Sequence, residues 1–506
     1  MTCSSITTSR PRALLGVLLA GATLALTGAG KPPEELARAA IERGDGIAAE
    51  VTIRQALKAG AKPDSLRALM GEALLLEGNL RDARKWLGEG GFAKGSEARG
   101  WRARGQLELA SGNLPAAGQA FDAALKLTAD DPLLWVQIAR LRYAGGEQAQ
   151  AVSASDRAIA IAPDNVRALE LKGMLVREQY GLVASLPWFE AALKQAPDDR
   201  SVLGEYAATL GEIGNYRDML VVCRKLAKVD PGNPRALYLQ AVLAARAGRN
   251  GLARSIMLKT GNALRDMPAA ILLNGVLEYR AGNLNLAIDH LDRLLRLQPD
   301  NREAAELLAR ALAQSGDDAQ VVGRFAMIAD RPGASAYLLE IAARSLDRVK
   351  RGREAGLLRA RIPTADGAPF VPLLAGAPIG VLQARYNDDR FRTDVIVPYL
   401  RALLSAGRST EALDIAGQLR DRNPGSSDAH ILLGDVRMMT GNTAGAVAEW
   451  REAARIRLTP PLVQRLYTGL RLTGHPATGR ALAAGFFNQN PQSAVARRLL
   501  GLPAPH

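Results

Sequence analysis

Glycine recurs at one fixed interval along this chain of 506 residues. Successive members of the set lie 34 residues apart, or twice that distance, and the set comprises Gly44, Gly78, Gly112, Gly146, Gly214, Gly248, Gly282 and Gly316. A period of 34 residues is typical of stacked helical hairpins, each of which buries its apolar face only against its neighbours. The spacing therefore predicts an all-α array of repeats without a single globular core.

Side-chain size follows the same period. In the unit around Gly78, small residues stand seven positions before and five positions after the glycine, at Gly71 and Ala83, and bulky Leu87 follows four positions later. Most other units repeat this pattern. We expect the helices to touch closely at the small residues, and we expect the bulky side chain to fill a hole in the next unit.

The ends of the helices are marked as well. Glycine can take the left-handed conformation that ends a helix, and asparagine follows it in Gly78-Asn79, Gly112-Asn113, Gly214-Asn215 and Gly282-Asn283. Proline with an acidic or amide residue ends units at residues 163–165, 197–199, 231–233 and 299–301. Each unit is therefore predicted to be a helix, a turn and a second helix.

The chain resembles the tetratricopeptide repeat family at these positions. The best match to the family pattern is given by Trp135, Ala139, Gly146, Ala151, Ala158 and Pro163. The resemblance implies a right-handed superhelical solenoid. Three local departures are Tyr180 in place of a turn glycine, Met219 in place of a small residue, and Arg265 where proline is usual.

Residues 1–29 have the composition of a cleaved secretory signal. Arg10 and Arg12 precede an apolar run at residues 13–26, and small residues follow. The run is shorter than the roughly 20 apolar residues of a spanning helix. We expect export to the periplasm with no transmembrane span after cleavage; the alternative is membrane association through an uncleaved N-terminal segment. Residues 26–31 resemble a lipoprotein acceptor site in which Ala29 replaces the cysteine, and residues 33–37 resemble envelope proteins of exopolysaccharide and sorting-signal export systems.

Two sub-arrays are predicted after the signal. The first, of about ten repeats, covers residues 30–361. Residues 362–392 are rich in proline and glycine, which favours an irregular linker or hinge. The second sub-array covers residues 393–506 and ends in a capping helix at residues 493–500.

Charge restricts the partners only in part. The chain has 65 Lys plus Arg against 51 Asp plus Glu, a formal net charge of +14. Outside the cytosol this favours acidic polysaccharide, lipid headgroups or acidic protein segments, and we expect no nucleic acid partner for an exported chain. The alternative is a solvated helical surface that uses arginine, because no block of five or more like charges is present.

The sequence contains no recognisable catalytic motif. The four histidines are scattered, Cys223 is the only cysteine after the signal, and no glycine-rich loop ends in Lys-Ser or Lys-Thr. We therefore expect neither metal nor cofactor, a buried Cys223, and a protein that is not an enzyme.

The resemblance implies that the first helix of each hairpin lines a concave groove. The predicted groove residues are Arg99, Arg102, Arg140, Tyr143, Arg167, Arg177, Arg235, Tyr238, Arg246, Tyr279, Arg280 and Arg310. Arginine beside tyrosine suits carboxylates, sugars and peptides. Glutamates are interleaved with these residues, so the alternative is an ordinary surface of paired charges. The lysine and asparagine pattern of chaperone-binding members is missing.

Three functions remain open on this basis. The first is a non-catalytic scaffold of the bacterial envelope that binds a protein partner in the groove, in polysaccharide export or envelope assembly. The second is direct binding of acidic polysaccharide by a basic groove, and the third is a regulatory module of an enzyme.

Overall fold

The computed structural model describes residues 32–88, 90–298, 301–330, 334–365, 377–390 and 392–503. The chain divides into two compact units, and the second unit begins at Arg104. The described residues form helices and contain no strand, which confirms the all-α prediction. The predicted signal at residues 1–29 lies outside the described residues.

The described residues of the first compact unit form four complete helices and the start of a fifth. They are α1 (Pro33–Glu42), α2 (Gly46–Lys58), α3 (Pro63–Leu76), α4 (Leu80–Leu87) and α5 (Glu97–Ala110), and α5 runs across the division.

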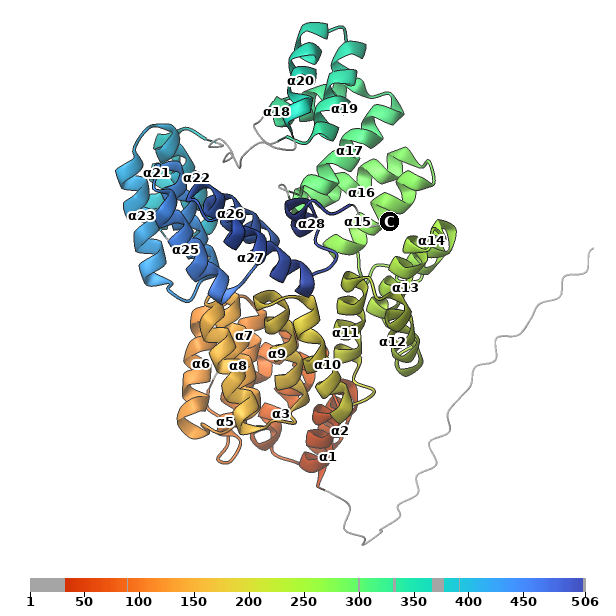
Figure 1. Ribbon diagram of the computed structural model, residues 1–506. Coiled ribbons are helices and arrows are strands. Elements are labelled where there is room, and N and C mark those ends of the chain that lie inside the picture. Colours follow the sequence, from red (N-terminus) through yellow and green to blue (C-terminus); the bar gives the residue numbers. More distant parts are fainter. Residues whose placement is uncertain are drawn as a thin grey trace, which may run out of the picture. The chain divides into compact units, whose positions relative to one another are not determined.

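The second unit holds the remaining helices. They are α6 (Leu114–Leu127), α7 (Pro132–Ala144), α8 (Gln148–Ile161), α9 (Val166–Gln179), α10 (Leu182–Gln195), α11 (Arg200–Ile213), α12 (Tyr216–Val229), α13 (Pro234–Arg246), α14 (Asn250–Leu258), α15 (Pro268–Arg280), α16 (Leu284–Leu297), α17 (Arg302–Ser315), α18 (Asp318–Asp330), α19 (Ala336–Arg348), α20 (Gly352–Ala365), α21 (Ile379–Asp388), α22 (Thr393–Ser405), α23 (Ser409–Arg422), α24 (Ser427–Met439), α25 (Thr443–Ile456), α26 (Pro460–Leu472), α27 (Pro476–Gln489) and α28 (Ala494–Leu500). Figure 1 shows these helices paired into hairpins.

The turns within the hairpins have the predicted chemistry. Gly78 has a φ of 73° just after the end of α3, in the left-handed region that glycine adopts without steric cost. The side chain of Asn79 then accepts a hydrogen bond from the backbone N–H of Asp82 and so caps α4. The predicted helix, turn and helix of this unit are therefore confirmed.

Bulky residues pack inside their own hairpin. A methyl group added at Gly105 would lie 2.3 Å from the ring of Phe121, and one at Gly71 would lie 2.4 Å from Leu87. In both cases the glycine is on the first helix and the bulky residue is on the second helix of the same unit. The prediction that the bulky side chain fills a hole in the next unit was therefore wrong. The glycine has no side chain, and the bulky residue of the paired helix fills the space that this leaves.

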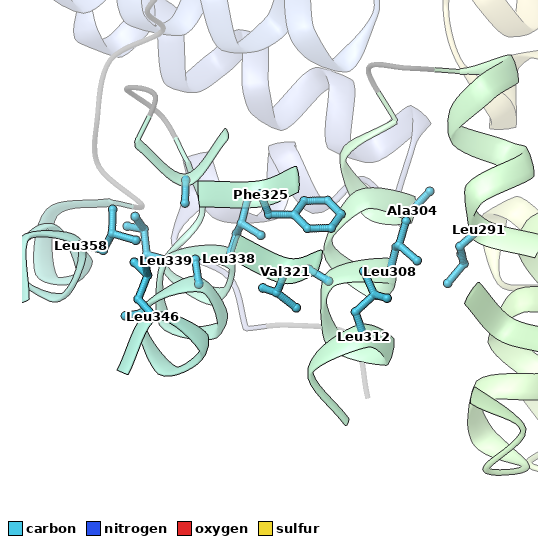
Figure 2. Packing of buried hydrophobic residues seen from close by; sticks show 14 of the residues in the cluster. Leu291, Ala304, Leu308, Leu312, Val321, Phe325, Leu338, Leu339, Leu346 and Leu358 are labelled. Carbon is cyan, nitrogen blue, oxygen red and sulfur yellow. The ribbon is translucent and has the colours of Figure 1, made fainter. Parts of the chain in front are cut away.

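Contacts between neighbouring hairpins form clusters of buried apolar side chains (Figure 2). One cluster in the second unit joins Leu291 of α16, Leu308 of α17, Phe325 of α18 and Leu339 of α19. All four side chains are almost completely buried. Repeats of this kind are stabilised by such neighbour contacts.

The expected linker is partly helical. Helix α20 continues through Pro363 to Ala365, and residues 379–388 form α21, although we predicted an irregular segment from 362 to 392. Pro378 precedes α21, where its fixed φ and missing N–H suit a helix start, and Leu382 is buried. Residues 366–376 of the expected linker lie outside the described residues.

Two distant segments of the second unit are in direct contact. The N–H of Ala149 donates to the carbonyl of Gly425 at 3.1 Å, and the N–H of Ser427 donates to Oε1 of Gln148 at 3.0 Å. The start of α10 and helix α27 also touch. We call these contacts between residues 146–182 and residues 424–490 the array contact. It joins the two predicted sub-arrays, an interaction that the repeat pattern did not indicate.

Candidate binding groove

All twelve predicted groove residues lie on the first helices of hairpins. Arg99 and Arg102 are on α5, Arg140 and Tyr143 on α7, Arg167 and Arg177 on α9, Arg235, Tyr238 and Arg246 on α13, Tyr279 and Arg280 on α15, and Arg310 on α17. Their side chains nevertheless have different surroundings. The arginines fall into two groups, which differ in exposure and in partners.

In the first unit, Arg99 and Arg102 share one carboxylate. Their guanidinium nitrogens lie 2.6 and 2.7 Å from the two oxygens of Glu72, whose side chain is buried. Glu72 is on α3, so the two ion pairs connect neighbouring first helices. A buried carboxylate requires such partners, because an unpaired charge there would be costly. These two arginines therefore hold repeats together.

Arg167 has a similar role in the second unit. Its guanidinium is bonded to Glu170 at 2.7 Å and to Asp199, which precedes α11. Burial alone would lower the pKa of Arg167, but the charges of Glu170 and Asp199 outweigh it and raise the pKa. The guanidinium charge is therefore compensated within the chain.

Glu205 of α11 forms ion pairs with two arginines. Arg177 lies 3.0 Å from one carboxylate oxygen and Arg235 lies 2.8 Å from the other. Burial would raise the pKa of Glu205, but the two guanidinium groups outweigh it and lower the pKa. The ion pairs connect α9, α11 and α13. Together with Glu72 and Glu170, this carboxylate engages five of the predicted groove arginines, as the paired-charge alternative expected.

Tyr143 is linked to the array contact through Glu178. Its hydroxyl donates to Glu178 at 2.6 Å, and Glu178 lies 3.6 Å from Arg457, just beyond the end of α25. Burial and the bond to Glu178 raise the pKa of Tyr143 to about 12. Its position on a first helix was predicted, but the partner that its network reaches was not.

The second group of arginines is exposed. Arg140, Arg246, Arg280 and Arg310 form no ion pair with a carboxylate in the described part of the chain. Arg140 lies near both Glu170 and Arg167, and burial among protein atoms lowers its pKa although its surface reaches solvent. Arg280 donates only a long hydrogen bond, 3.4 Å, to Asn250.

Aromatic rings accompany two of these exposed arginines. The guanidinium carbon of Arg310 lies 5.3 Å from the ring centre of Tyr279 and 6.0 Å from that of Tyr337. Arg246 lies 5.8 Å from the ring centre of Tyr216. All three distances are within the range of cation–π attraction. Tyr238, another predicted groove residue, is half-buried, and burial raises its pKa.

Tyr337 was missed in the sequence. It is exposed near the start of α19 and lies three periods after Arg235, in the same register as Arg99 and Arg167. The register could have identified it, but the unit around α19 lacks the turn glycine and Lys350 occupies the left-handed position instead. We call Arg246, Arg280, Arg310, Tyr279 and Tyr337 the arginine–tyrosine face.

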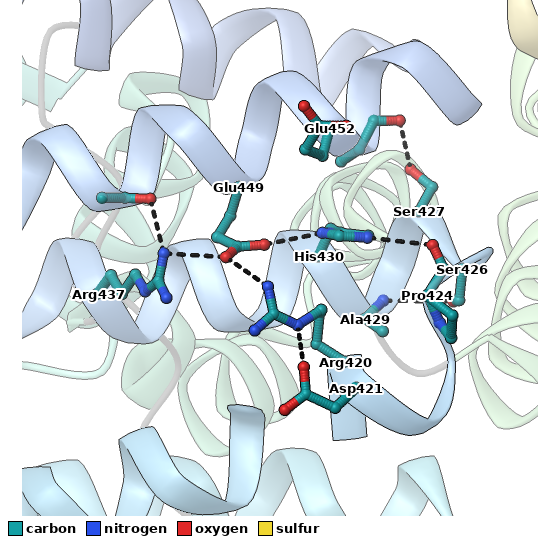
Figure 3. Close-up of polar contacts among 12 residues, drawn as sticks. Arg420, Asp421, Pro424, Ser426, Ser427, Ala429, His430, Arg437, Glu449 and Glu452 are labelled. Carbon is teal, nitrogen blue, oxygen red and sulfur yellow. Dashed lines mark hydrogen bonds and ion pairs between the residues drawn. The ribbon is translucent and has the colours of Figure 1, made fainter. Parts of the chain in front are cut away.

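A further polar cluster lies elsewhere in the second unit (Figure 3). Glu449 of α25 lies 2.9 Å from both Arg420 and Arg437 and 2.8 Å from Nδ1 of His430. The other ring nitrogen of His430 lies 3.2 Å from the carbonyl oxygen of Pro424. The cluster connects α23, α24 and α25 and has no open position for a ligand among these contacts, so we assign it to repeat packing.

Two kinds of feature are absent from the described residues. No group of three or more His, Cys, Asp or Glu side chains there could hold a metal ion. No helix among these residues is both long enough and apolar enough to cross a bilayer.

Known proteins share the repeat. A family model described as tetratricopeptide repeat matches residues 77–132, 272–320 and 400–461. Cellulose synthase operon protein C from Xanthomonas axonopodis pv. citri (strain 306) is 25% identical over 354 residues, which cover 56% of this chain and 23% of that protein. The chain thus spans less than a quarter of the length of this curated relative.

Solved structures give weaker likenesses. A human IFIT1 dimer with PPP-AAAA is 14% identical, with a TM-score of 0.41 over 84% of this chain and 94% of that chain. The pilF protein of Pseudomonas aeruginosa is 18% identical, with a TM-score of 0.34 over 44% of this chain and 97% of that chain. These TM-scores are too low to show a shared overall arrangement. The family match at these three stretches, the 34-residue period and the helical hairpins together show that this chain contains tetratricopeptide repeats.

Proposed function

We propose that the chain is a non-catalytic scaffold of the bacterial cell envelope, exported through its N-terminal segment, which binds a protein partner on the first helices of its repeats. The observation that carries the proposal is the division of the groove arginines. Five of them form ion pairs with carboxylates of the chain itself. By contrast, Arg246, Arg280 and Arg310 are exposed on the successive first helices α13, α15 and α17. Exposed arginines beside aromatic rings are common anchors of protein interfaces.

A link to polysaccharide export rests on the relative. The name of that relative places it in a cellulose synthase operon, and its similarity to this chain extends over 354 residues. The role proposed for this chain is therefore to hold another component of an export or envelope assembly, not to act on the polymer. The N-terminal pattern of Arg10, Arg12 and the apolar run that follows supports export.

Direct binding of an acidic polysaccharide is the second candidate. The four exposed arginines and the net charge of +14 favour it. The carboxylates paired with the other five arginines argue against a continuous basic groove, since they cancel charge along α5, α9 and α11. Such binding would depend strongly on salt, because solvent-exposed charges are screened. Regulation of an enzyme is a third possibility, for which adding the chain would have to change that enzyme's activity.

The test uses the full chain with a C-terminal affinity tag, expressed in a bacterium and fractionated beside periplasmic and cytosolic markers. Brief cross-linking in intact cells, followed by purification at low and high salt, would identify bound proteins, and acidic glycan would be assayed in the same eluates. The proposal expects periplasmic recovery and the same cross-linked protein at both salt concentrations. Recovery with the cytosolic marker would contradict export, and glycan retained only at low salt would favour the second candidate.

A further inference from the structure

We infer that the arginine–tyrosine face binds an extended acidic segment of a protein partner through its carboxylates. This inference rests on the proposed scaffold function and names the chemistry of the partner. The face covers consecutive first helices, because α13 contacts α15, α15 contacts α17, and α17 contacts α19. Exposed guanidinium groups at Arg246, Arg280 and Arg310 thus follow one another along one row of helices.

The carboxylates around this face are already engaged. Glu278 accepts from Arg254 at 2.8 Å, and Glu306 accepts from Arg302 at 3.1 Å. Farther along, Asp318 accepts from Arg348 at 3.2 Å and Glu340 accepts from Arg344 at 2.6 Å. Their arginine partners differ from those of the face. The acidic groups of these helices therefore do not neutralise the face.

Asp347 of α19 is likewise engaged, by Arg359, and Glu303 is then the remaining acidic residue of this row. It is exposed near the start of α17, seven residues before Arg310. Seven residues of a helix span about 10 Å along its axis, so Glu303 is two turns from the guanidinium of Arg310. Glu303 is therefore too far from Arg310 to neutralise its charge by direct contact.

The geometry at Arg310 favours a carboxylate over a sugar ring. Because the guanidinium lies near both Tyr279 and Tyr337, each ring has one face covered by it. The covered ring faces are closed to a stacking sugar, whereas a carboxylate binds the N–H groups at the edge of a guanidinium. The two rings also restrict the arginine side chain in the free protein, which lowers the entropy cost of binding.

The helix spacing suits an extended peptide. Packed helix axes lie about 8–10 Å apart. A polyproline II segment rises about 3.1 Å per residue and places every third side chain on the same side, roughly 9 Å apart. Acidic residues at every third position would therefore meet successive helices of the row. This match commits the inference to a peptide segment in which Asp or Glu recurs at that interval.

The experiment uses the full chain and a fluorescent synthetic peptide with Glu at every third position and neutral residues between. Binding is measured by fluorescence polarisation at several salt concentrations, with a peptide in which Gln replaces each Glu as the reference. We expect the Gln peptide to bind about tenfold more weakly or worse, since charge-assisted bonds to arginine are lost. Equal binding of the two peptides would overturn the inference.

Two triple variants separate the face from general charge. The face variant carries Arg246→Gln, Arg280→Gln and Arg310→Gln. The control variant carries Arg217→Gln, Arg296→Gln and Arg353→Gln, which are exposed arginines of second helices. Both lose the same charge. We expect the face variant to bind the Glu peptide about tenfold more weakly than the control variant, and equal losses would overturn the inference. Thermal melting of both variants would verify that they fold.

Polygalacturonate serves as the competing probe. If it binds with the same dependence on the three face arginines and the Glu peptide does not, the face recognises acidic glycan and the inference fails. Cross-linking in cells with the face variant separates this result from the scaffold function. A partner captured by the parent chain and equally by the face variant would leave the scaffold standing while excluding the face as its site. Absence of any partner for the parent chain would contradict the scaffold itself.

Discussion

Oδ1 of Asn490 accepts a hydrogen bond from the backbone N–H of Leu182 at 3.1 Å, although 308 residues separate them. Leu182 is the first residue of α10, and the preceding Gly181 has no side chain with which to cap that helix. Some other second helices carry their own cap, as Asn79 does for α4 and Asn215 does for α12. Asn490 therefore supplies to α10, across the array contact, the cap that its own sequence lacks.

Replacing Asn490 by Ala should loosen the array contact. The change removes the acceptor for Leu182, and loss of a helix cap costs about 1 kcal/mol. We expect faster hydrogen exchange at the first amides of α10 and a small decrease in melting temperature. Asn442→Ala is the matched control, since Asn442 caps its own helix α25 at 2.8 Å. It should destabilise without affecting exchange at α10; unchanged exchange there in Asn490→Ala would contradict the proposed cap.

The features that recur with the 34-residue period could be predicted from the sequence. Turn glycines such as Gly78 and caps such as Asn79 follow local rules, so their roles could be read from spacing alone. The ion pairs could not be predicted in this way, because arginines in the same register have different partners. Arg99 pairs with Glu72 of the preceding repeat. Arg167 pairs with Glu170 of its own helix and with Asp199 just before the next first helix. A register gives the face of the helix on which a side chain lies but not the partner of that side chain.

The array contact was beyond sequence reasoning for a related reason. It is built from backbone groups and from short polar side chains such as Gln148 and Ser427, which are buried although their types are usually exposed. No spacing connects them, since they are 279 residues apart. Only the placement of whole repeats brings these residues together.

Packing within a hairpin gives the second prediction. Gly105→Ala should lower the free energy of unfolding by about 1–3 kcal/mol, because a methyl group would lie 2.3 Å from the Phe121 ring and the core would have to shift. Gly323→Ala in α18 is the control, since nothing lies within 4 Å of the added atom. It should stabilise by up to about 1 kcal/mol through helix propensity. Urea unfolding midpoints should move in opposite directions, and a shared direction would refute the packing argument.

The Glu449 cluster gives the third prediction. Glu449→Gln removes the negative charge that faces Arg420, Arg437 and His430. We expect a loss of about 3 kcal/mol, at the low end for breaking a buried pair, because both arginines keep roughly a quarter of their side-chain surface in water. Hydrogen exchange should become faster in α23–α25.

Glu452 provides the control for that change. It lies on the same helix, its side chain is 52% exposed, and it pairs with Arg455 three residues later. Glu452→Gln should change stability by no more than about 0.5 kcal/mol, as is usual for surface pairs. If both substitutions had equally small effects, the cluster around Glu449 would not hold the repeats together.

The last prediction concerns alkaline pH. Burial and the bond to Glu178 raise the pKa of Tyr143 to about 12, above the ordinary value of 10. The folded chain therefore keeps this proton where the unfolded chain has lost it, so the stabilisation is complete below pH 10 and is lost as the pH rises toward 12. In Tyr143→Phe the urea midpoint should fall less steeply as the pH rises through this window. Tyr180→Phe, which changes an exposed ring, is the control and should show the same dependence on pH as the parent chain. An unchanged slope in Tyr143→Phe would show that this hydroxyl does not couple the array contact to pH.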